Sequence, residues 1–204
     1  MKRALAIATL LGAANFLAPH GTHAQTPPRD PPPHSFGERL QVEGIRNAAK
    51  VSAQLYRGAQ PHAEGLPELQ KLGITTIVDL RRENKEKIAW EKKTSEGLGM
   101  QFVHIPVSGW SAPSDAQVAQ FLALFRDHPE AKVFVHCHYG DDRTGVFVAA
   151  YRMVFDKFST SEAIQEMDRF GFNRPWHPAM RAYVSAFPEH LDSSPALAPF
   201  HNQH

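Results

Sequence analysis

The sequence is poor in cysteine and shows no excess of charge of either sign. One cysteine among 204 residues excludes an intramolecular disulfide and a zinc site built from several cysteines. The 22 Lys and Arg residues balance 21 Asp and Glu residues, so bulk charge gives no reason to expect binding to nucleic acid. With 42% apolar and 21% charged residues, the composition is that of one ordinary folded domain with appendages.

A long hydrophobic run is also lacking, because the most apolar segment covers only residues 4–18. Lys2 and Arg3 precede it, and Thr22-His23-Ala24 follows it. At fifteen residues the segment is shorter than the roughly 20 that a transmembrane helix needs. We therefore predict a signal peptide over residues 1–24, with an uncleaved N-terminal anchor as the alternative. This interpretation predicts an exported protein, periplasmic or secreted, without stable membrane association after cleavage.

The remainder divides into a linker, a domain and a tail. Five of the 16 prolines fall within residues 27–33, which predicts an extended linker over residues 25–35. The folded domain is expected over residues 36–188. The composition of residues 189–204, with serines and prolines, predicts a flexible tail. The lone cysteine lies in the domain, and without a partner in an oxidising compartment it favours a chemical role over a structural one.

Within the domain, apolar runs of two kinds alternate. Short β-branched runs such as residues 74–80 and 132–136 predict buried strands, and apolar residues at helical spacing follow them. This order predicts an α/β fold with a mainly parallel central sheet flanked by helices. In such a sheet ligands bind where strands end and helices begin. Strands are expected near 55–57, 74–80, 100–105 and 132–136, and helices over 64–72, 84–98, 143–155, 161–170 and 178–187. A further helix, capped by Ser114 or Asp115, is expected to carry Val118, Phe121, Leu122 and Phe125.

One strand-to-helix connection combines a cysteine with an arginine at a fixed spacing. Residues 136–145 read HCHYGDDRTG, between a buried strand and an apolar helix. A loop of this length can curl around one tetrahedral oxyanion, with its backbone N–H groups and the helix dipole directed inward. Gly140 permits the turn, and Arg143 offers two donors to phosphate oxygens. The same positive field favours the thiolate of Cys137, which is the nucleophilic form.

The other members of this loop receive supporting roles. Thr144 is placed to donate a hydrogen bond to the sulfur, which helps the sulfur leave. His136 is expected to order the loop from beneath rather than to act as a base. The predicted phosphate-binding loop consists of His138, Tyr139, Gly140, Asp141, Asp142 and Arg143.

The loop resembles the signature H-C-x-x-G-x-x-R-[S/T] of the cysteine-dependent protein tyrosine and dual-specificity phosphatases. All fixed positions are met by His136, Cys137, Gly140, Arg143 and Thr144. Residues 56–61 (YRGAQP) and 78–81 (VDLR) also resemble the opening segments of the atypical, plant-and-fungi-like dual-specificity group. The resemblance covers residues 55–187. It implies phosphomonoester hydrolysis through a phosphocysteine intermediate, without metal or cofactor.

That family needs a carboxylic acid to protonate the leaving oxygen. Asp115 lies 22 residues before Cys137, a spacing that resembles the acid position of the atypical group, and a helix cap is its alternative role. Asp142, next to Arg143, is the rival acid, because myotubularin-like and some bacterial phosphatases carry an aspartate there. Asp79, at a strand end beside Arg81 and Arg82, is interpreted as a member of a structural ion pair. Arg174, Trp176 and His177 are assigned to a surface turn, with the edge of the pocket as the alternative.

The resemblance predicts a phosphorylated protein or a small phosphomonoester as substrate, and most directly protein phosphotyrosine, with dual specificity as an extension. Asp141 and Asp142 oppose a heavily charged substrate, although inositol phosphate or phosphoinositide hydrolysis stays an alternative. An inactive phosphate-binding module is the non-enzyme alternative. The twelve histidines show no helical pair spaced for a metal, so no metal site is predicted.

Overall fold

The computed structural model describes residues 34–172 and 175–203. The predicted signal peptide and all but the last two residues of the predicted linker lie outside the described residues. The elements follow the predicted order closely. In chain order they are β1 (Glu38–Arg39), β2 (Ala49–Lys50), β3 (Leu55–Ala59), α1 (Gly65–Lys71), β4 (Thr76–Asp79), α2 (Lys85–Gly97), β5 (Gln101–His104), α3 (Asp115–Asp127), β6 (Val133–Cys137), α4 (Asp142–Phe155), α5 (Thr160–Arg169), α6 (Pro178–Ser185), α7 (Phe187–Ser193) and the 3₁₀ helix η1 (Ala198–Gln203).

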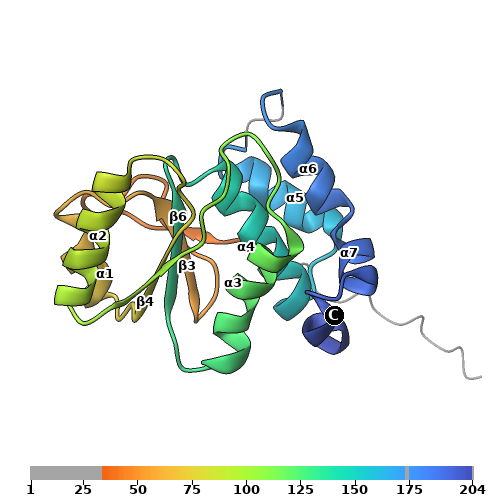
Figure 1. Ribbon diagram of the computed structural model, residues 1–204, viewed down its shortest axis with the longest axis horizontal. Helices are drawn as coiled ribbons and strands as arrows, with labels where there is room; N and C mark the ends of the chain where they lie inside the picture. Colours follow the sequence, from red (N-terminus) through yellow and green to blue (C-terminus); the bar gives the residue numbers. More distant parts are fainter. Residues whose placement is uncertain (1–33, 173–174, 204) are drawn as a thin grey trace, which may run out of the picture. The chain divides into compact units, whose positions relative to one another are not determined.

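The central sheet has the strand order β1-β2-β3-β6-β4-β5. The strands β3, β6, β4 and β5 run parallel, and β1 and β2 add an antiparallel edge. Helices pack on both sides of this sheet, with α1 and α2 on one side and α3, α4, α5 and α6 on the other (Figure 1). The predicted α/β fold with a mainly parallel sheet is confirmed.

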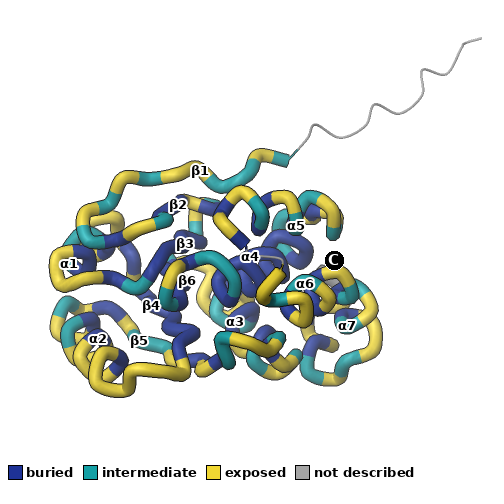
Figure 2. Tube along the Cα trace, turned by 90° about the horizontal axis from the view of Figure 1, so that it is seen from above, coloured by how far each residue is buried: buried dark blue, intermediate teal, exposed yellow. Residues whose placement is uncertain are grey.

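Local sequence explains why these elements form where they do. Every residue of β4 and β6 is buried, which their β-branched and aromatic composition permits. Helix α4 is apolar on nearly all sides and lies buried at the centre (Figure 2). Ser114 begins α3 and Ser159 begins α5, each through a capping box with the side chain three residues further on.

Two apolar cores lie on the two faces of the sheet. The smaller includes Leu66 and Leu69 of α1 with Ile77 and Phe134 of the strands. The larger joins α3 and α4 to the opposite face and extends to the last helices. Together they fix the two central strands, β6 and β4, whose carboxyl ends carry the residues of the next section.

The prediction of a flexible tail after residue 188 is wrong. Residues 187–193 form α7 and residues 198–203 form η1. Leu191, Leu197 and Phe200 are at most 1% exposed and belong to the larger core. The segment contains Ser193, Ser194, Pro195 and Pro199, but these three apolar side chains bury against the domain and hold the segment in place.

Among the described residues, none of the helices is both long enough and apolar enough to cross a membrane.

Candidate active site

A pocket opens at the carboxyl ends of the central strands, where β6 leads through residues 138–141 into α4. Its volume is about 540 Å³. The connections after β4 and β5 and the segment before α6 complete its wall. The lining residues are Arg82, Glu83, Asn84, Ser108, Gly109, Trp110, Cys137, His138, Tyr139, Asp141, Asp142, Arg143 and His177.

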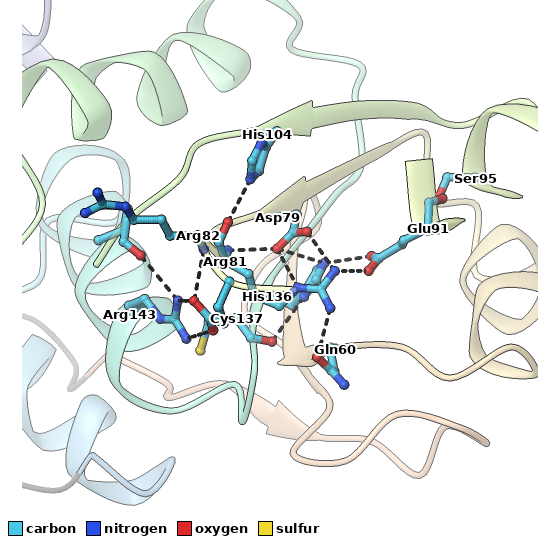
Figure 3. Close-up of polar contacts among 12 residues, drawn as sticks. Gln60, Asp79, Arg81, Arg82, Glu91, Ser95, His104, His136, Cys137 and Arg143 are labelled. Atoms are coloured by element: carbon cyan, nitrogen blue, oxygen red, sulfur yellow. Dashed lines mark hydrogen bonds and ion pairs between the residues drawn. The ribbon is translucent and has the colours of Figure 1, made fainter. Parts of the chain in front are cut away.

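Cys137 and Arg143 meet at the floor of this pocket, as the spacing predicts. Cys137 is the last residue of β6 and is 2% exposed. Arg143 lies in the first turn of α4 and is 7% exposed. Figure 3 shows the Cys137 sulfur beside the Arg143 guanidinium. The N-terminus of a fourteen-residue helix therefore faces the same point as the guanidinium, and both favour an anion there.

Gly140 is the residue that lets the loop close over the pocket floor. Its φ is +75°, a region that favours glycine. A Cβ atom here would lie 2.3 Å from the backbone of Gly58 on β3, so any other side chain would push the loop away from the sheet. The predicted role of Gly140 in the turn therefore agrees with its conformation and with its packing.

Thr144 does not make the predicted hydrogen bond. Its hydroxyl is fully buried and has no hydrogen-bond partner among the described residues, and no bond to the Cys137 sulfur is formed. The side chain lies in the first turn of α4, directly after Arg143. An unpaired buried hydroxyl at this place is costly unless another group, such as water, satisfies it.

Beneath the loop, His136 belongs to a cluster of four buried charged residues that we call the buried quartet: Asp79, Arg81, Glu91 and His136. The His136 Nδ1 lies 3.2 Å from the Cys137 carbonyl oxygen, and its Nε2 lies 2.8 Å from a Glu91 carboxylate oxygen. Burial lowers the pKa of His136, but Glu91 and Asp79 outweigh it and raise the pKa above its ordinary value. These contacts beneath the nucleophile agree with the predicted ordering role.

Arg81 joins the two carboxylates of the buried quartet. It donates to Asp79 at 2.7 and 2.9 Å and to Glu91 at 2.5 Å (Figure 3). The interpretation of Asp79 and Arg81 as a structural ion pair is confirmed. Ligand atoms of Asp79, Glu91 and His136 lie within 4.8 Å of one another, which is close enough to coordinate one metal ion. The Arg81 guanidinium bonds both carboxylates, so the cluster already contains its counter-charge.

Asp115 does not reach the pocket. It is the first residue of α3, and its carboxylate accepts a hydrogen bond from Tyr183 at 2.8 Å and pairs with His190 at 3.0 Å. Burial raises the pKa of Asp115, but hydrogen bonds from Tyr183, Ser194 and His190 outweigh it and lower the pKa. An ionised carboxylate directed toward α6 and α7 has no proton to give at the pocket. The expectation of Asp115 as the general acid is therefore not met, and Ser114 rather than Asp115 caps the helix.

Asp142 lies in the pocket beside His177. Its carboxylate is 3.2 Å from the His177 Nε2, and the His177 ring packs against Trp110 with 5.6 Å between ring centroids. The preference for a surface turn is wrong for His177, which lines the pocket. The wall segment 106–114 contains no Asp or Glu. Of the two predicted acids, only Asp142 faces the reaction site.

Glu83 is a further pocket residue that the sequence analysis missed. Both Arg143 terminal nitrogens donate to its carboxylate, at 3.0 and 2.8 Å. The bond to Arg143, offset in part by burial, lowers the pKa of Glu83 to about 2. A negative charge thus occupies the donors that a bound phosphate needs. The sequence signal that could have indicated Glu83 as a pocket residue is its position, four residues after the end of β4.

The sequence is similar to those of known proteins. The family model for "DSP-PTPase phosphatase fused to NAD+ Kinase" matches residues 37–176. The dual specificity protein phosphatase TpbA of Pseudomonas aeruginosa is 30% identical over 169 residues, which cover 82% of this chain and 72% of the relative. Dual specificity protein phosphatase 26 of Rattus norvegicus is 31% identical over 140 residues, or 64% of each chain.

Solved structures agree with these matches. The crystal structure of P. aeruginosa TpbA superposes with a TM-score of 0.64 at 25% identity, over 82% of this chain and 97% of that one. The core catalytic domain of the PP-IP phosphatase SIW14 from S. cerevisiae also gives a TM-score of 0.64, at 19% identity over 80% of this chain and 97% of that one. At 19% identity, the second likeness concerns the fold alone.

Proposed function

Because the chain belongs to the family of cysteine-dependent dual-specificity phosphatases, we propose that it hydrolyses phosphotyrosine in phosphorylated proteins through a phosphocysteine intermediate. The observation that carries the proposal is the meeting of Cys137 and Arg143 at the pocket floor, before the N-terminus of α4. In the first step the Cys137 sulfur bonds to phosphorus and the bond from phosphorus to the phenolic oxygen breaks. In the second step water attacks phosphorus, which releases orthophosphate and restores the thiolate.

The substrate class rests on the pocket wall. Trp110 is 71% exposed and Tyr139 is 58% exposed, although both are large aromatic residues and both line the pocket. Exposed rings at a pocket edge are suited to contact a phenyl ring. The related TpbA has been crystallised in complex with pTyr, which supports the same class here. Glu83, Asp141 and Asp142 place negative charge around the floor, which disfavours an inositol polyphosphate.

The test uses hydrolysis of p-nitrophenyl phosphate and of a phosphotyrosine peptide in the presence of a chelator. We expect turnover by the wild type, none by Cys137→Ser, and a loss of about 10²- to 10³-fold for Arg143→Ala. Arg126→Ala, an exposed arginine on α3 paired with Asp127, is the matched control and is expected to match the wild type. Acid quench during turnover is expected to trap phosphate on Cys137. Turnover that survives Cys137→Ser would contradict the proposal.

Asp142 is the proton donor in this proposal, and His177 positions it. Asp142 protonates the phenolic oxygen as the first bond breaks and takes the proton back from the attacking water. The support is the 3.2 Å contact between the two side chains at the pocket, together with the direction of Asp115 away from it.

Leaving groups of different acidity test this assignment. Loss of a proton donor slows release of a weakly acidic phenol far more than release of nitrophenol, so Asp142→Asn is expected to lose about 10²- to 10⁴-fold on phosphotyrosine and much less on p-nitrophenyl phosphate. His177→Gln is expected to follow the same pattern more weakly. Asp115→Asn is the matched control, and its two losses are expected to be equal. A leaving-group dependence that appears with Asp115→Asn instead would overturn the assignment.

Export is part of the proposal and is carried by the sequence of residues 1–24. A basic pair, a fifteen-residue apolar segment and a small residue at position 24 favour a cleaved signal peptide. The measurement is the N-terminal sequence of protein recovered from the periplasm or medium. A product that begins at Gln25 is expected, and full-length protein held in the cytoplasm would contradict it.

A further inference from the structure

The loop is held from outside by a buried arginine that the reaction scheme leaves unused. Arg57 lies on β3 and is 1% exposed. Its Nη2 donates to the Gly140 carbonyl oxygen at 2.7 Å. Its Nε and Nη1 are buried without a hydrogen-bond partner, and no carboxylate pairs with it among the described residues. The guanidinium covers the Phe170 ring at 4.3 Å from its centroid.

A second donor reaches the same carbonyl. The Asn47 Nδ2 donates to the Gly140 oxygen at 3.0 Å and to the Phe170 oxygen at 2.9 Å. Asn47 has a φ of 54°, in the left-handed region, so its backbone conformation is one that few residue types adopt readily. Two side chains from separate segments therefore converge on one carbonyl of the loop.

The direction of that carbonyl decides the direction of the next N–H group. The peptide between Gly140 and Asp141 is trans, so its C=O and N–H point to opposite sides. The carbonyl faces Arg57 and the sheet, on the side where a Cβ of Gly140 would meet Gly58. The Asp141 N–H consequently faces the other side of the loop, toward the floor that holds Cys137 and Arg143.

We propose that Arg57 and Asn47 are positioning residues that orient the Gly140–Asp141 peptide so that its N–H binds the phosphate, and that Arg57 adds a buried positive charge to the oxyanion site. This inference rests on the proposed function, because it names how that site obtains one of its donors. Neither side chain touches the substrate.

The charge of Arg57 is present under working conditions. Burial lowers the pKa of Arg57 to about 10, against the opposing effects of Glu166, Cys137 and Asp141. The guanidinium therefore stays ionised at neutral pH. A buried cation without a paired carboxylate directs more of its field to nearby anions than a paired one does. The anions placed to receive it are the Cys137 thiolate and the bound phosphate.

Three variants separate orientation from charge. Arg57→Met removes both, Arg57→Lys keeps the charge without the planar fork, and Asn47→Gly removes the neutral donor while permitting the left-handed conformation. Arg126→Met is the matched control, because Arg126 also covers an aromatic ring, Phe200, at 5.2 Å from its centroid and has no contact with the loop.

The readouts are inhibition by orthophosphate, the pH dependence of Cys137 alkylation by iodoacetamide, and kcat against KM. For Arg57→Met we expect kcat/KM to fall about 10- to 100-fold, orthophosphate to bind about 10-fold more weakly, and the alkylation midpoint to move to higher pH. Arg57→Lys is expected to keep the alkylation midpoint of the wild type and to recover part of the turnover. Asn47→Gly is expected to weaken orthophosphate binding without moving the alkylation midpoint.

The inference is overturned if Arg57→Met keeps the inhibition constant of orthophosphate within twofold of Arg126→Met and has its alkylation midpoint at the same pH. Where circular dichroism shows that Arg57→Met is unfolded, Arg57→Lys and Asn47→Gly decide, and wild-type values in both of them overturn it. A wild type without turnover would refute the proposed function alone. Alkylation, and its slowing by orthophosphate, would still test the placement of the N–H group and the charge.

Discussion

Arg57 lies in the middle of β3, and Arg81 lies two residues after the end of β4. These two strands flank β6, and both arginines are 1% exposed. Their surroundings differ completely. Arg81 donates to Asp79, Glu91 and Gln60, which satisfies its guanidinium. Arg57 donates to one carbonyl, and its other nitrogens have no partner in the described part of the chain.

This difference indicates that the charge of Arg81 stabilises the fold, whereas the charge of Arg57 serves the active site. Removing Arg81 would leave two buried carboxylates of the buried quartet without their cation. Removing Arg57 would leave the Gly140 carbonyl with its second donor, Asn47. Burial of the Arg57 guanidinium costs desolvation free energy, and no ion pair offsets that cost. Such a loss of stability is common for functional residues.

Substitution of the two arginines by methionine gives the largest expected effect on stability. Arg81→Met is expected to lower the free energy of unfolding by about 3–5 kcal/mol, because it breaks a buried ion-pair network. Arg57→Met is expected to change it by about 1 kcal/mol or less, because methionine removes an orphaned charge and fills similar space.

The measurement is urea unfolding followed by circular dichroism, with Arg126→Met as the surface control. The comparison between the two arginines would fail if Arg57→Met were the more destabilising change.

The buried quartet also predicts how stability depends on pH. The pKa of His136 in the folded protein is raised by Glu91 and Asp79, after burial has lowered it. The folded state therefore binds the proton more tightly, and the contribution of His136 is complete below the unfolded pKa of about 6.5. It is lost as the pH rises through the folded value, at up to about 1.4 kcal/mol per pH unit.

Glu91→Gln sharpens this prediction, because it removes the nearest charge to His136 and keeps an acceptor for Arg81. We expect the unfolding free energy of the wild type to fall more steeply between pH 6 and pH 9 than that of the variant. Glu130→Gln, in the exposed pair of His128 and Glu130, serves as the control and is expected to follow the wild type. If the unfolding free energies of the wild type and Glu91→Gln changed with pH in parallel, Glu91 would not be what raises the proton affinity of His136.

Local signals explain why much of the fold and the centre of the site were predictable. The strand of residues 133–137, the turn at Gly140 and the start of α4 each depend on residues close in sequence. Cys137 and Arg143 come together because one strand, one loop and the first turn of one helix carry them, and all three are visible in the local sequence.

The remaining features depend on contacts between distant segments. Arg57 reaches the loop 83 residues away, and Glu91 lies on α2 whereas its partner His136 lies on β6. Asp115 faces Tyr183, 68 residues away, a partner that no spacing rule identifies. The tail folds because Leu197 and Phe200 meet a core formed by earlier elements. Periodicity and motif spacing contain no information on such partners.

Arg143 is a third arginine to compare with Arg57 and Arg81. The side chain of its partner Glu83 is 44% exposed and occupies the donors that a bound phosphate needs. The carboxylate partners of Arg81 are buried, whereas the carboxylate partner of Arg143 is reached by solvent and can be displaced by a ligand.

Glu83→Gln is expected to lower the inhibition constant of orthophosphate a few-fold, because the amide competes for the Arg143 guanidinium without a negative charge. Glu96→Gln, on the exposed face of α2, is the matched control. Weaker orthophosphate binding in Glu83→Gln would mean that the Glu83 carboxylate holds Arg143 in its binding orientation. Glu83 would then be a structural partner of Arg143, as Asp79 and Glu91 are of Arg81.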